Sequence, residues 1–279
     1  KINKERYIVE RKPINSGVYG LFNTSSPLLQ DKNVRLALQS GTDTTAVREA
    51  VGKDTPELYL PFVNGQLTGD VPSAPIYNKA NAERLLDEAG WRLDGAVRKK
   101  DGVALKLSVV TTKNNDFEKA LDIMAGQWRS LGISVTTSIV DPTDRSQNVV
   151  QNILQNRNYD VLLYQLTIGG DPDVYAYWHS SQATNGFNFS NYASSVSDDA
   201  LLSARSRIEP DLRNAKYLTF ARQWLADAPA IGLFQATTQY AYSKSVHALP
   251  SDEVLISAND RYAEVLYWSV GDRLVQRTP

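Results

Sequence analysis

The middle of the chain alternates strand-like and helix-like patterns of hydrophobic residues. Leu105, Leu107 and Val109 alternate with other residues, and so do the apolar positions from 133 to 139, as in half-buried strands. Between these two stretches, apolar residues recur at spacings of four and three from 117 to 131, which is the period of an amphipathic helix. These patterns predict a strand, a helix and a second strand.

The next stretch extends this alternation. A second helix is predicted from Pro142 to 156, because proline suits a first helical position and apolar residues cluster from 149 to 154. It leads into a nearly unbroken apolar run from Tyr159 to Leu166, which is typical of a strand covered on both faces. Residues 105–167 therefore predict a β-α-β-α-β unit with parallel strands and right-handed crossovers.

Further elements are predicted on both sides of this unit. Apolar periodicity and capping residues predict helices after Asp31, after Thr42 or Asp43, and at residues 78–90, 198–208 and 211–227. Strands are predicted at 18–23, 231–237 and 240–243, with hairpin turns at Asp94-Gly95 and Asp101-Gly102. The irregular segment 53–77 is predicted to wrap the surface, either as a functional loop or as a structured cover. The fold class is therefore α/β, with a mixed sheet flanked by helices.

The stretch from Tyr159 to Trp178 is the corner around which the chain is organised. After the buried strand, Gly169 and Gly170 allow a bend, Asp171 suits a helix N-cap, and proline follows at 172. A helix is therefore predicted to open at residue 172.

Three polar turns follow the three predicted parallel strands. They span residues 111–114, 140–144 and 167–171. In open parallel sheets, ligands bind in the crevice beyond the carboxyl ends of the strands. We therefore expect a ligand site where these turns meet.

Composition removes several classes of function. The 279 residues are 42% hydrophobic, and 30 basic against 31 acidic residues give a net charge of -1, so overall charge does not favour nucleic acid or an anionic membrane as partner. No apolar run is long enough for a spanning helix, and the first residues lack the apolar core of a signal peptide, as in a mature or trimmed chain. With no cysteine, disulfides and thiolate chemistry are excluded, while the redox compartment stays open.

Acidic and histidine residues near the corner have two interpretations each. Asp171 and Asp173 suit the paired acids of a hydrolase or a metal site, but two carboxylates at a helix start are more often a cap and a dipole partner. His179 has no second histidine close in sequence, so a polar contact at a helix end is favoured over metal binding. We predict no catalytic residue, no metal ligand and no cofactor.

Cations and aromatic residues at the expected crevice are also ambiguous. Lys113 and Arg145 suit a ligand carboxylate as well as a surface salt bridge. Tyr175, Tyr177 and Trp178 suit stacking on a ligand, although aromatic residues at this density more often pack in the core. No nucleophile elbow, P-loop or GxGxxG motif occurs, so no motif favours catalysis or nucleotide binding.

Several segments in order resemble one protein family. The sequence is similar to the extracellular solute-binding proteins of ABC importers in the dipeptide, oligopeptide and nickel group, over nearly the whole chain but only the second half of a member. The segments that carry the resemblance are YGLFNTSSPLLQDKNVRLAL, YNKANAERLLDEAGW, GQWRSLGISV, YDVLLYQLTIGGDPD and RNAKYLTFARQWLADAPAIGLF.

The resemblance implies a two-lobed periplasmic-binding-protein-like fold of which this chain is the second lobe. Residues 1–16 would then be an extended lead-in from a missing N-terminal lobe, 17–245 the ligand-binding lobe, and 246–279 a tail returning toward the first lobe. A complete protein would close two lobes on a solute and deliver it to the permease subunits of an ABC transporter. The implied location is extracytoplasmic, either periplasmic or as a lipid-anchored protein.

The resemblance carries over only part of the family's ligand contacts. Peptide-binding members hold the peptide amino group with an aspartate four residues before the proline of the turn, and here that position is Ile168. The arginine that contacts the ligand carboxylate in dipeptide binders aligns with Thr111, with Lys113 as a nearby cation. We predict these ligand-binding residues: Asn23, Thr111, Thr112, Lys113, Asn114, Ile168, Gly169, Gly170, Asp171 and Trp178.

Three hypotheses about function follow. The first is a non-enzymatic lobe of an importer's receptor that binds a peptide-like or other small polar solute. The second is a carboxylate-based hydrolase on an α/β scaffold, which needs two acids in one cleft with a raised pKa on one of them. The third is a lobe repurposed for signalling or adhesion.

Overall fold

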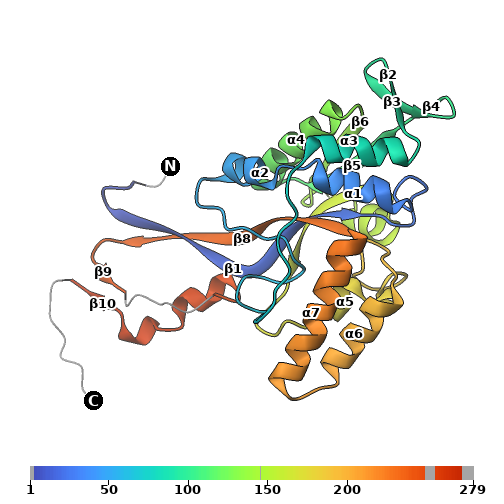
Figure 1. Ribbon diagram of the computed structural model, residues 1–279. Helices are drawn as coiled ribbons and strands as arrows, with labels where there is room; N and C mark the ends of the chain where they lie inside the picture. The colour runs from blue at the N-terminus through green and yellow to red at the C-terminus, as the bar shows by residue number, and fades with distance from the viewer. Residues whose placement is uncertain (1–2, 145, 249–254, 272–279) are drawn as a thin grey trace.

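A five-stranded mixed sheet forms the centre of the molecule, in the order β6-β5-β7-β1-β8 (Figure 1). The computed structural model describes residues 3–144, 146–248 and 255–271. β5 pairs in parallel with β6 and β7, whereas β1 pairs antiparallel with β7 and β8. The strands are β1 (Tyr7–Phe22), β5 (Lys106–Thr112), β6 (Ser134–Val140), β7 (Val161–Thr167) and β8 (Ala230–Ser243). The predicted parallel core within a mixed sheet is confirmed.

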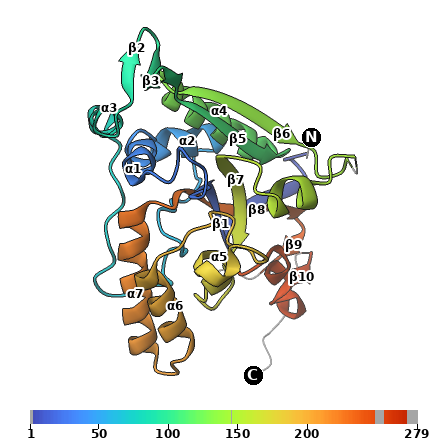
Figure 2. The same ribbon diagram turned by 90° about the vertical axis from the view of Figure 1, so that its right-hand side faces the viewer.

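Helices cover both faces of this sheet (Figures 1 and 2). Leu163 of β7 belongs to the hydrophobic cluster on one face, and Leu162 and Leu166 belong to the cluster on the other, so β7 is buried on both faces as predicted. The first cluster holds residues of α1 (Lys32–Ser40), α2 (Thr44–Val51), α3 (Lys79–Glu88) and α4 (Asn115–Ser130). The second holds residues of α5 (Tyr175–Trp178), α6 (Ser195–Arg205) and α7 (Pro210–Asp227).

Side-chain caps set where the first three helices begin. Asp31, Asp43 and Asn78 each accept hydrogen bonds from backbone N–H groups in the first turn of α1, α2 and α3. Such caps satisfy donors that have no partner within the helix. The predicted starts of these three helices are therefore confirmed.

The segment 53–77 contains no helix or strand and covers the outer edge of the sheet. The backbone N–H of Gln235 in β8 donates to the carbonyl of Pro56 at 3.0 Å. Leu58, Leu60 and Phe62 are buried in the second cluster. The segment is therefore a structured cover, one of the two roles that the sequence left open.

Smaller elements lie at the margins of the molecule. The predicted hairpin turns join the strands of a second sheet, β2 (Arg92–Asp94), β3 (Val97–Lys100) and β4 (Val103–Ala104). β1 and β8 continue beyond the main sheet as a two-stranded ribbon, and β1 passes residue 16 without a break (Figure 1). The division at residues 16, 17, 245 and 246 stays a prediction. Near the ribbon lie short 3-10 turns, Ala258–Tyr262 and Val265–Tyr267, and the pair β9 (Val246–His247) and β10 (Ser269–Val270).

The helix predicted from Pro142 to 156 is wrong in most of its length. Among the described residues of this stretch, only a π-helical turn forms, η1 (Val150–Gln155). The side chain of Asp141 accepts from Thr143 N–H at 2.9 Å, and that of Asp144 accepts from Ser146 N–H at 2.9 Å. Such local turns compete with helical hydrogen bonds, so the polar half of this stretch stays irregular. Arg145 lies outside the described residues.

The corner and the last strands also differ from the prediction. The helix after the corner begins at Tyr175, not at 172, because Asp171 binds Arg213 and does not cap a helix. Asp173 instead accepts a hydrogen bond from Tyr175 N–H at 3.2 Å. The two strands expected at 231–237 and 240–243 are one continuous strand, β8, which is held in register by β1.

Candidate functional site

The end of β7 has one edge with no strand beside it. β5 pairs with β7 only from Val161 to Leu163, whereas β1 pairs along the strand as far as Thr167. Within the described part of the chain, the residues Tyr164–Thr167 therefore have a strand neighbour on one side only. We call their other side the free edge of β7. Because backbone groups alternate in direction along a strand, this edge presents the N–H and C=O of Gln165.

A cavity of about 700 Å³ lies against the free edge. Its volume is in the range of sites that hold small solutes. Segments from four parts of the chain meet around it, namely η1 with the turn after it, the end of β7, α5 through Tyr177, and residues 184–189. The lining is Val150, Leu154, Gln155, Arg157, Tyr164, Gln165, Leu166, Thr167, Tyr177, Thr184, Asn185, Gly186, Phe187 and Phe189.

Aromatic side chains form one wall of this cavity. Phe189 packs edge-on against Tyr164 and Phe187, with ring centroids 5.8 and 6.2 Å apart. The hydroxyl of Tyr177 donates to the carbonyl of Thr167 at 2.6 Å. Burial raises the pKa of Tyr177, so its hydroxyl stays protonated and remains a donor. The wall therefore combines apolar ring surface with a fixed strand end.

A second hollow, of about 460 Å³, continues from the first toward the ends of β5 and β6. Val150, Leu154 and Tyr164 line both hollows. Thr112, Pro142 and Asp144, from the first two predicted turns, line the second hollow. The expected crevice beyond the strand ends is therefore present as a groove.

Residues 111–114 divide between structural roles and the groove. The hydroxyl of Thr111 is buried and donates to the Leu163 carbonyl at 2.9 Å, whereas Thr112 lines the second hollow. Lys113 lies 3.0 Å from Asp141. Hydrogen bonds from the side chain and backbone of Thr143, together with Lys113, lower the pKa of Asp141 to about 2. The side chain of Asn114 caps α4.

The other predicted site residues hold the corner together. Ile168 and Trp178 are buried, and the ring of Trp178 packs between Tyr19 and Trp224. Asn23 donates to the carbonyl of Tyr159 at 3.1 Å. Of the ten predicted residues only Thr112 lines either hollow, so a ligand role for the others stays a prediction.

The two glycines and Asp171 form the turn itself. Gly169 has φ +83°, and its carbonyl accepts from Asn15 and Gln66 at 2.9 and 3.0 Å. A Cβ at Gly170 would lie 3.0 Å from Ile256. The carboxylate of Asp171 accepts hydrogen bonds from both terminal nitrogens of Arg213, at 2.8 and 3.0 Å.

The acids at the corner do not suit a hydrolase. Asp171 pairs with Arg213, and Asp173 pairs with Arg205 at 2.8 Å. The hydrogen bond from Arg213 lowers the pKa of Asp171, whereas a general acid needs a raised pKa. The described residues also hold no group of three or more His, Asp or Glu side chains placed to bind a metal ion. This corner is built for ion pairing.

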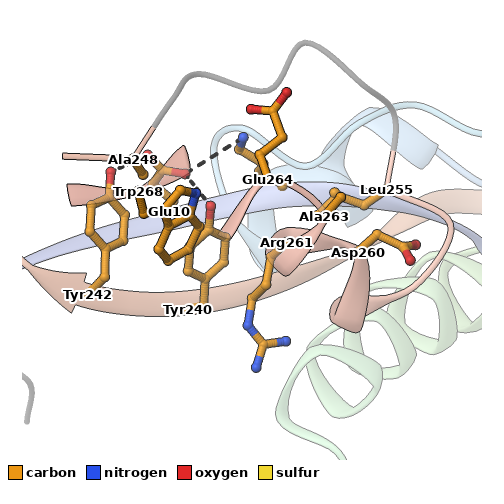
Figure 3. A pocket seen from close by; sticks show the side chains of 11 residues that line it. Glu10, Tyr240, Tyr242, Ala248, Leu255, Asp260, Arg261, Ala263, Glu264 and Trp268 are labelled. Carbon is orange, nitrogen blue, oxygen red and sulfur yellow. Dashed lines mark hydrogen bonds and ion pairs between the residues drawn. The ribbon is translucent and has the colours of Figure 1, made fainter. Parts of the chain in front are cut away.

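A smaller pocket of about 130 Å³ lies where the β1–β8 ribbon meets the residues 255–268 (Figure 3). The Glu10 carboxylate there accepts from the hydroxyls of Tyr240 and Tyr242, at 2.7 and 2.9 Å. Burial acts to raise the pKa of Glu10, but these hydrogen bonds and Lys12 lower it overall. The pocket is below the size of a typical solute site. The groove beside β7 is therefore the better candidate.

Sequence reasoning missed most of the groove's walls. Arg157 lies between the predicted helix and the predicted strand, and Tyr164 lies within the strand that was predicted to be buried. Phe187 and Phe189 lie in a segment rich in serine and asparagine, where two aromatic residues flanking Asn188 were the available signal. The sequence does not show that β5 pairs with β7 only as far as Leu163, which leaves the edge beside the cavity without a strand neighbour in the described part of the chain.

Comparisons with known proteins agree with the resemblance seen in the sequence. The family model described as bacterial extracellular solute-binding proteins, family 5 Middle, matches residues 1–188. The oligopeptide-binding protein AppA of Bacillus subtilis is 27% identical over 240 residues, which cover 83% of this chain and 43% of AppA. The chain thus spans less than half the length of this relative.

Solved structures share the fold. AppA from Bacillus subtilis in complex with a nonapeptide superposes with a TM-score of 0.81 at 21% identity, covering 95% of this chain and 53% of AppA. NikZ from Campylobacter jejuni in complex with Ni(L-His) superposes with a TM-score of 0.80 at 21% identity, covering 96% of this chain and 54% of NikZ. These likenesses confirm the predicted fold class. Among the described residues, no helix is long and apolar enough to span a membrane.

Proposed function

This chain belongs to the bacterial extracellular solute-binding proteins of family 5, and we propose that it forms one wall of a receptor that captures a small solute for an ABC importer. The solute is peptide-like or another small polar molecule, and the chain carries out no catalysis. The partners are the permease subunits of the transporter, and the location is outside the cytoplasmic membrane, in the periplasm or as a lipid-anchored protein.

The free edge of β7 beside the large cavity is the observation that carries this proposal. The edge offers the backbone N–H and C=O of Gln165 beside a groove that is large enough for a small solute. An extended peptide can add to such an edge as a further strand, so that main-chain hydrogen bonds supply affinity without fixing the side chains. A peptide-like backbone is the solute chemistry that this edge matches best.

We further propose that a second lobe closes over the groove. The chain covers 43% of AppA. The two hollows share lining residues and form one open groove, not an enclosed chamber. Closure around a ligand buries most of its surface. The 279-residue chain alone should therefore bind the solute more weakly than the full-length protein does, which calorimetry on both can measure. Equal affinity would contradict the two-lobe proposal.

The large cavity does not favour a free amino terminus. Ile168 is apolar and buried, and the described lining of the large cavity contains no carboxylate. Asp171 is already paired with Arg213, so it does not substitute for one. A buried ammonium group without a charged partner loses several kcal/mol, by order of magnitude. Amino-blocked peptides should therefore bind better than free ones to this wall.

A scan of backbone methylation tests the edge-pairing proposal. N-acetyl-tetraalanine and its singly N-methylated variants would be titrated into the full-length protein by calorimetry. Since the edge presents one carbonyl, that of Gln165, methylation of the peptide amide that donates to it should weaken binding about tenfold, and methylation of the neighbouring amides, which face away from the edge, much less. The methyl groups at the neighbouring positions are the matched control. Equal effects at all positions, or no binding of any blocked peptide, would refute the proposal.

A further inference from the structure

Arg157 lies in the turn just before β7, where its backbone conformation is fixed. Its φ is +50°, in the left-handed region that few residues other than glycine adopt. Its carbonyl accepts hydrogen bonds from Tyr159 N–H at 2.9 Å and from the side chain of Asn23 at 3.3 Å. The direction in which this side chain leaves the backbone is therefore set by the turn.

The guanidinium group is held against the wall of the large cavity. Its carbon lies 4.7 Å from the centre of the Phe189 ring, and Nη2 donates to the carbonyls of Ala183 and Gly186 at 3.1 and 3.0 Å. Nε is buried and has no hydrogen-bond partner among the described residues. Of the five N–H donors of an arginine, those on Nη2 are the ones that bind other described residues.

Arg157 also lacks a counter-ion. Across residues 3–144, 146–248 and 255–271, no carboxylate forms an ion pair with it. It is the one charged residue in the described lining of the large cavity, where every other residue is apolar, aromatic or neutral and polar. Burial lowers the pKa of Arg157, but arginine stays protonated at neutral pH. A half-buried positive charge thus faces a cavity whose other described lining residues are neutral.

We propose that Arg157 binds a carboxylate of the solute, so that the groove selects molecules with a single negative charge. This assignment rests on the proposed function, and it narrows the solute to a carboxylate whose remainder is neutral, such as the carboxyl end of an amino-blocked peptide. Because Nη2 is engaged by two carbonyls and Nε is buried, Nη1 is the nitrogen that would donate to the carboxylate. Such a charge-assisted hydrogen bond removes the cost of the uncompensated charge. The free edge of β7 would then bind the chain that leads away from this carboxylate.

A purely structural role makes a different prediction. Through Nη2, Arg157 also ties the turn before β7 to the carbonyls at 183 and 186. If this tie were its whole role, replacing Arg157 would lower stability and weaken charged and neutral ligands alike. A carboxylate site instead changes the preference between a charged ligand and its neutral analogue.

The test compares N-acetyl-trialanine with its C-terminal amide, by calorimetry on the full-length protein. The acid should bind at least tenfold more tightly than the amide. In Arg157→Gln this ratio should fall to about one, and Arg157→Lys should keep part of it. The control is Arg222→Gln, which makes the same change of charge by removing an exposed arginine of α7 that pairs with Asp70. This variant should keep the full ratio. Equal binding of acid and amide to the unmodified protein would overturn the proposal.

A second measurement does not depend on peptide binding. The NMR resonance of the Arg157 Nε–H group, identified by its absence in Arg157→Lys or by through-bond assignment, would be followed during titration with acetate and with acetamide. Acetate should shift it and acetamide should not. If no peptide binds but acetate still shifts the resonance, the peptide-like solute is wrong and the carboxylate site stands. If acetate leaves the resonance unchanged, the carboxylate site is refuted, whatever the peptides do.

Discussion

Gly232 in β8 gives a sharp test of how the segment 53–77 covers the sheet. An alanine Cβ at this position would lie 2.8 Å from the carbonyl oxygen of Leu58 and 2.8 Å from Cα of Tyr59. Both are backbone atoms, so neither can move aside as a flexible side chain would. Gly232→Ala should therefore push the covering segment away from β8.

The expected cost follows from overpacking. Forcing an extra carbon into a well-packed interior costs roughly 1–3 kcal/mol. For chains somewhat smaller than this one, 1 kcal/mol shifts the melting temperature by about 2–4 °C. Thermal unfolding followed by circular dichroism should therefore show Gly232→Ala melting several degrees below the parent protein.

Gly126 is the matched control for this substitution. It lies on the exposed side of α4, and an added Cβ there meets no atom within 4 Å. Because glycine is a poor helix former, Gly126→Ala should raise stability by about 0.5–1 kcal/mol. The same chemical change should thus have opposite signs at the two sites. If Gly232→Ala melts at or above the parent temperature, the close approach of residues 58–59 to β8 is wrong.

Two further substitutions test the corner after β7. Trp178 is 1% exposed and packs against Tyr19 and Trp224. Trp178→Ala should therefore lower the free energy of unfolding in urea by roughly 3–5 kcal/mol. A decrease of less than about 1 kcal/mol would contradict the place of Trp178 in the core. The hydrogen bond from Arg213 lowers the pKa of Asp171 below 3.8, so its stabilisation is full well above that value and is lost as pH falls through the lowered pKa. Asp171→Asn should therefore lower stability at pH 7, by less than about 1 kcal/mol because the pair is partly exposed, and this difference should shrink as the pH falls through the lowered pKa. A difference that does not change on acidification would argue against the ion pair.

Periodicity was enough to predict most of the elements. The apolar spacing from 117 to 131 predicted α4, and the capping side chains of Asp31, Asp43 and Asn78 predicted the starts of three helices. These signals are local, so each can be read without knowing which segments meet in space. The parallel core also followed, because strands separated by a helix pair in parallel.

Features that depend on register or on distant partners were not predictable. Nothing near Asp171 in sequence indicates that Arg213 binds it, and without that ion pair Asp171 looks like a helix cap. Likewise, the sequence predicts β5 and β7 as strands, but it does not predict their register. The register shows that the pairing ends at Leu163, so β5 does not cover the edge of β7 beyond that residue. The expected crevice was therefore placed at the strand ends, whereas several of its walls, including Arg157, come from segments whose approach depends on contacts between distant parts of the chain.

The most direct test of the central claim is native mass spectrometry of the full-length protein purified from its own host. If the groove beside β7 holds a solute, part of the protein should carry an added small-molecule mass that disappears on denaturation. Thr167→Trp, which fills the cavity from an exposed position on β7, should lose that mass, whereas Thr219→Trp, at an exposed position on α7, should keep it. A bound molecule that Thr167→Trp retains as fully as the parent does, or a protein whose mass matches its bare chain throughout, would contradict a solute site beside β7.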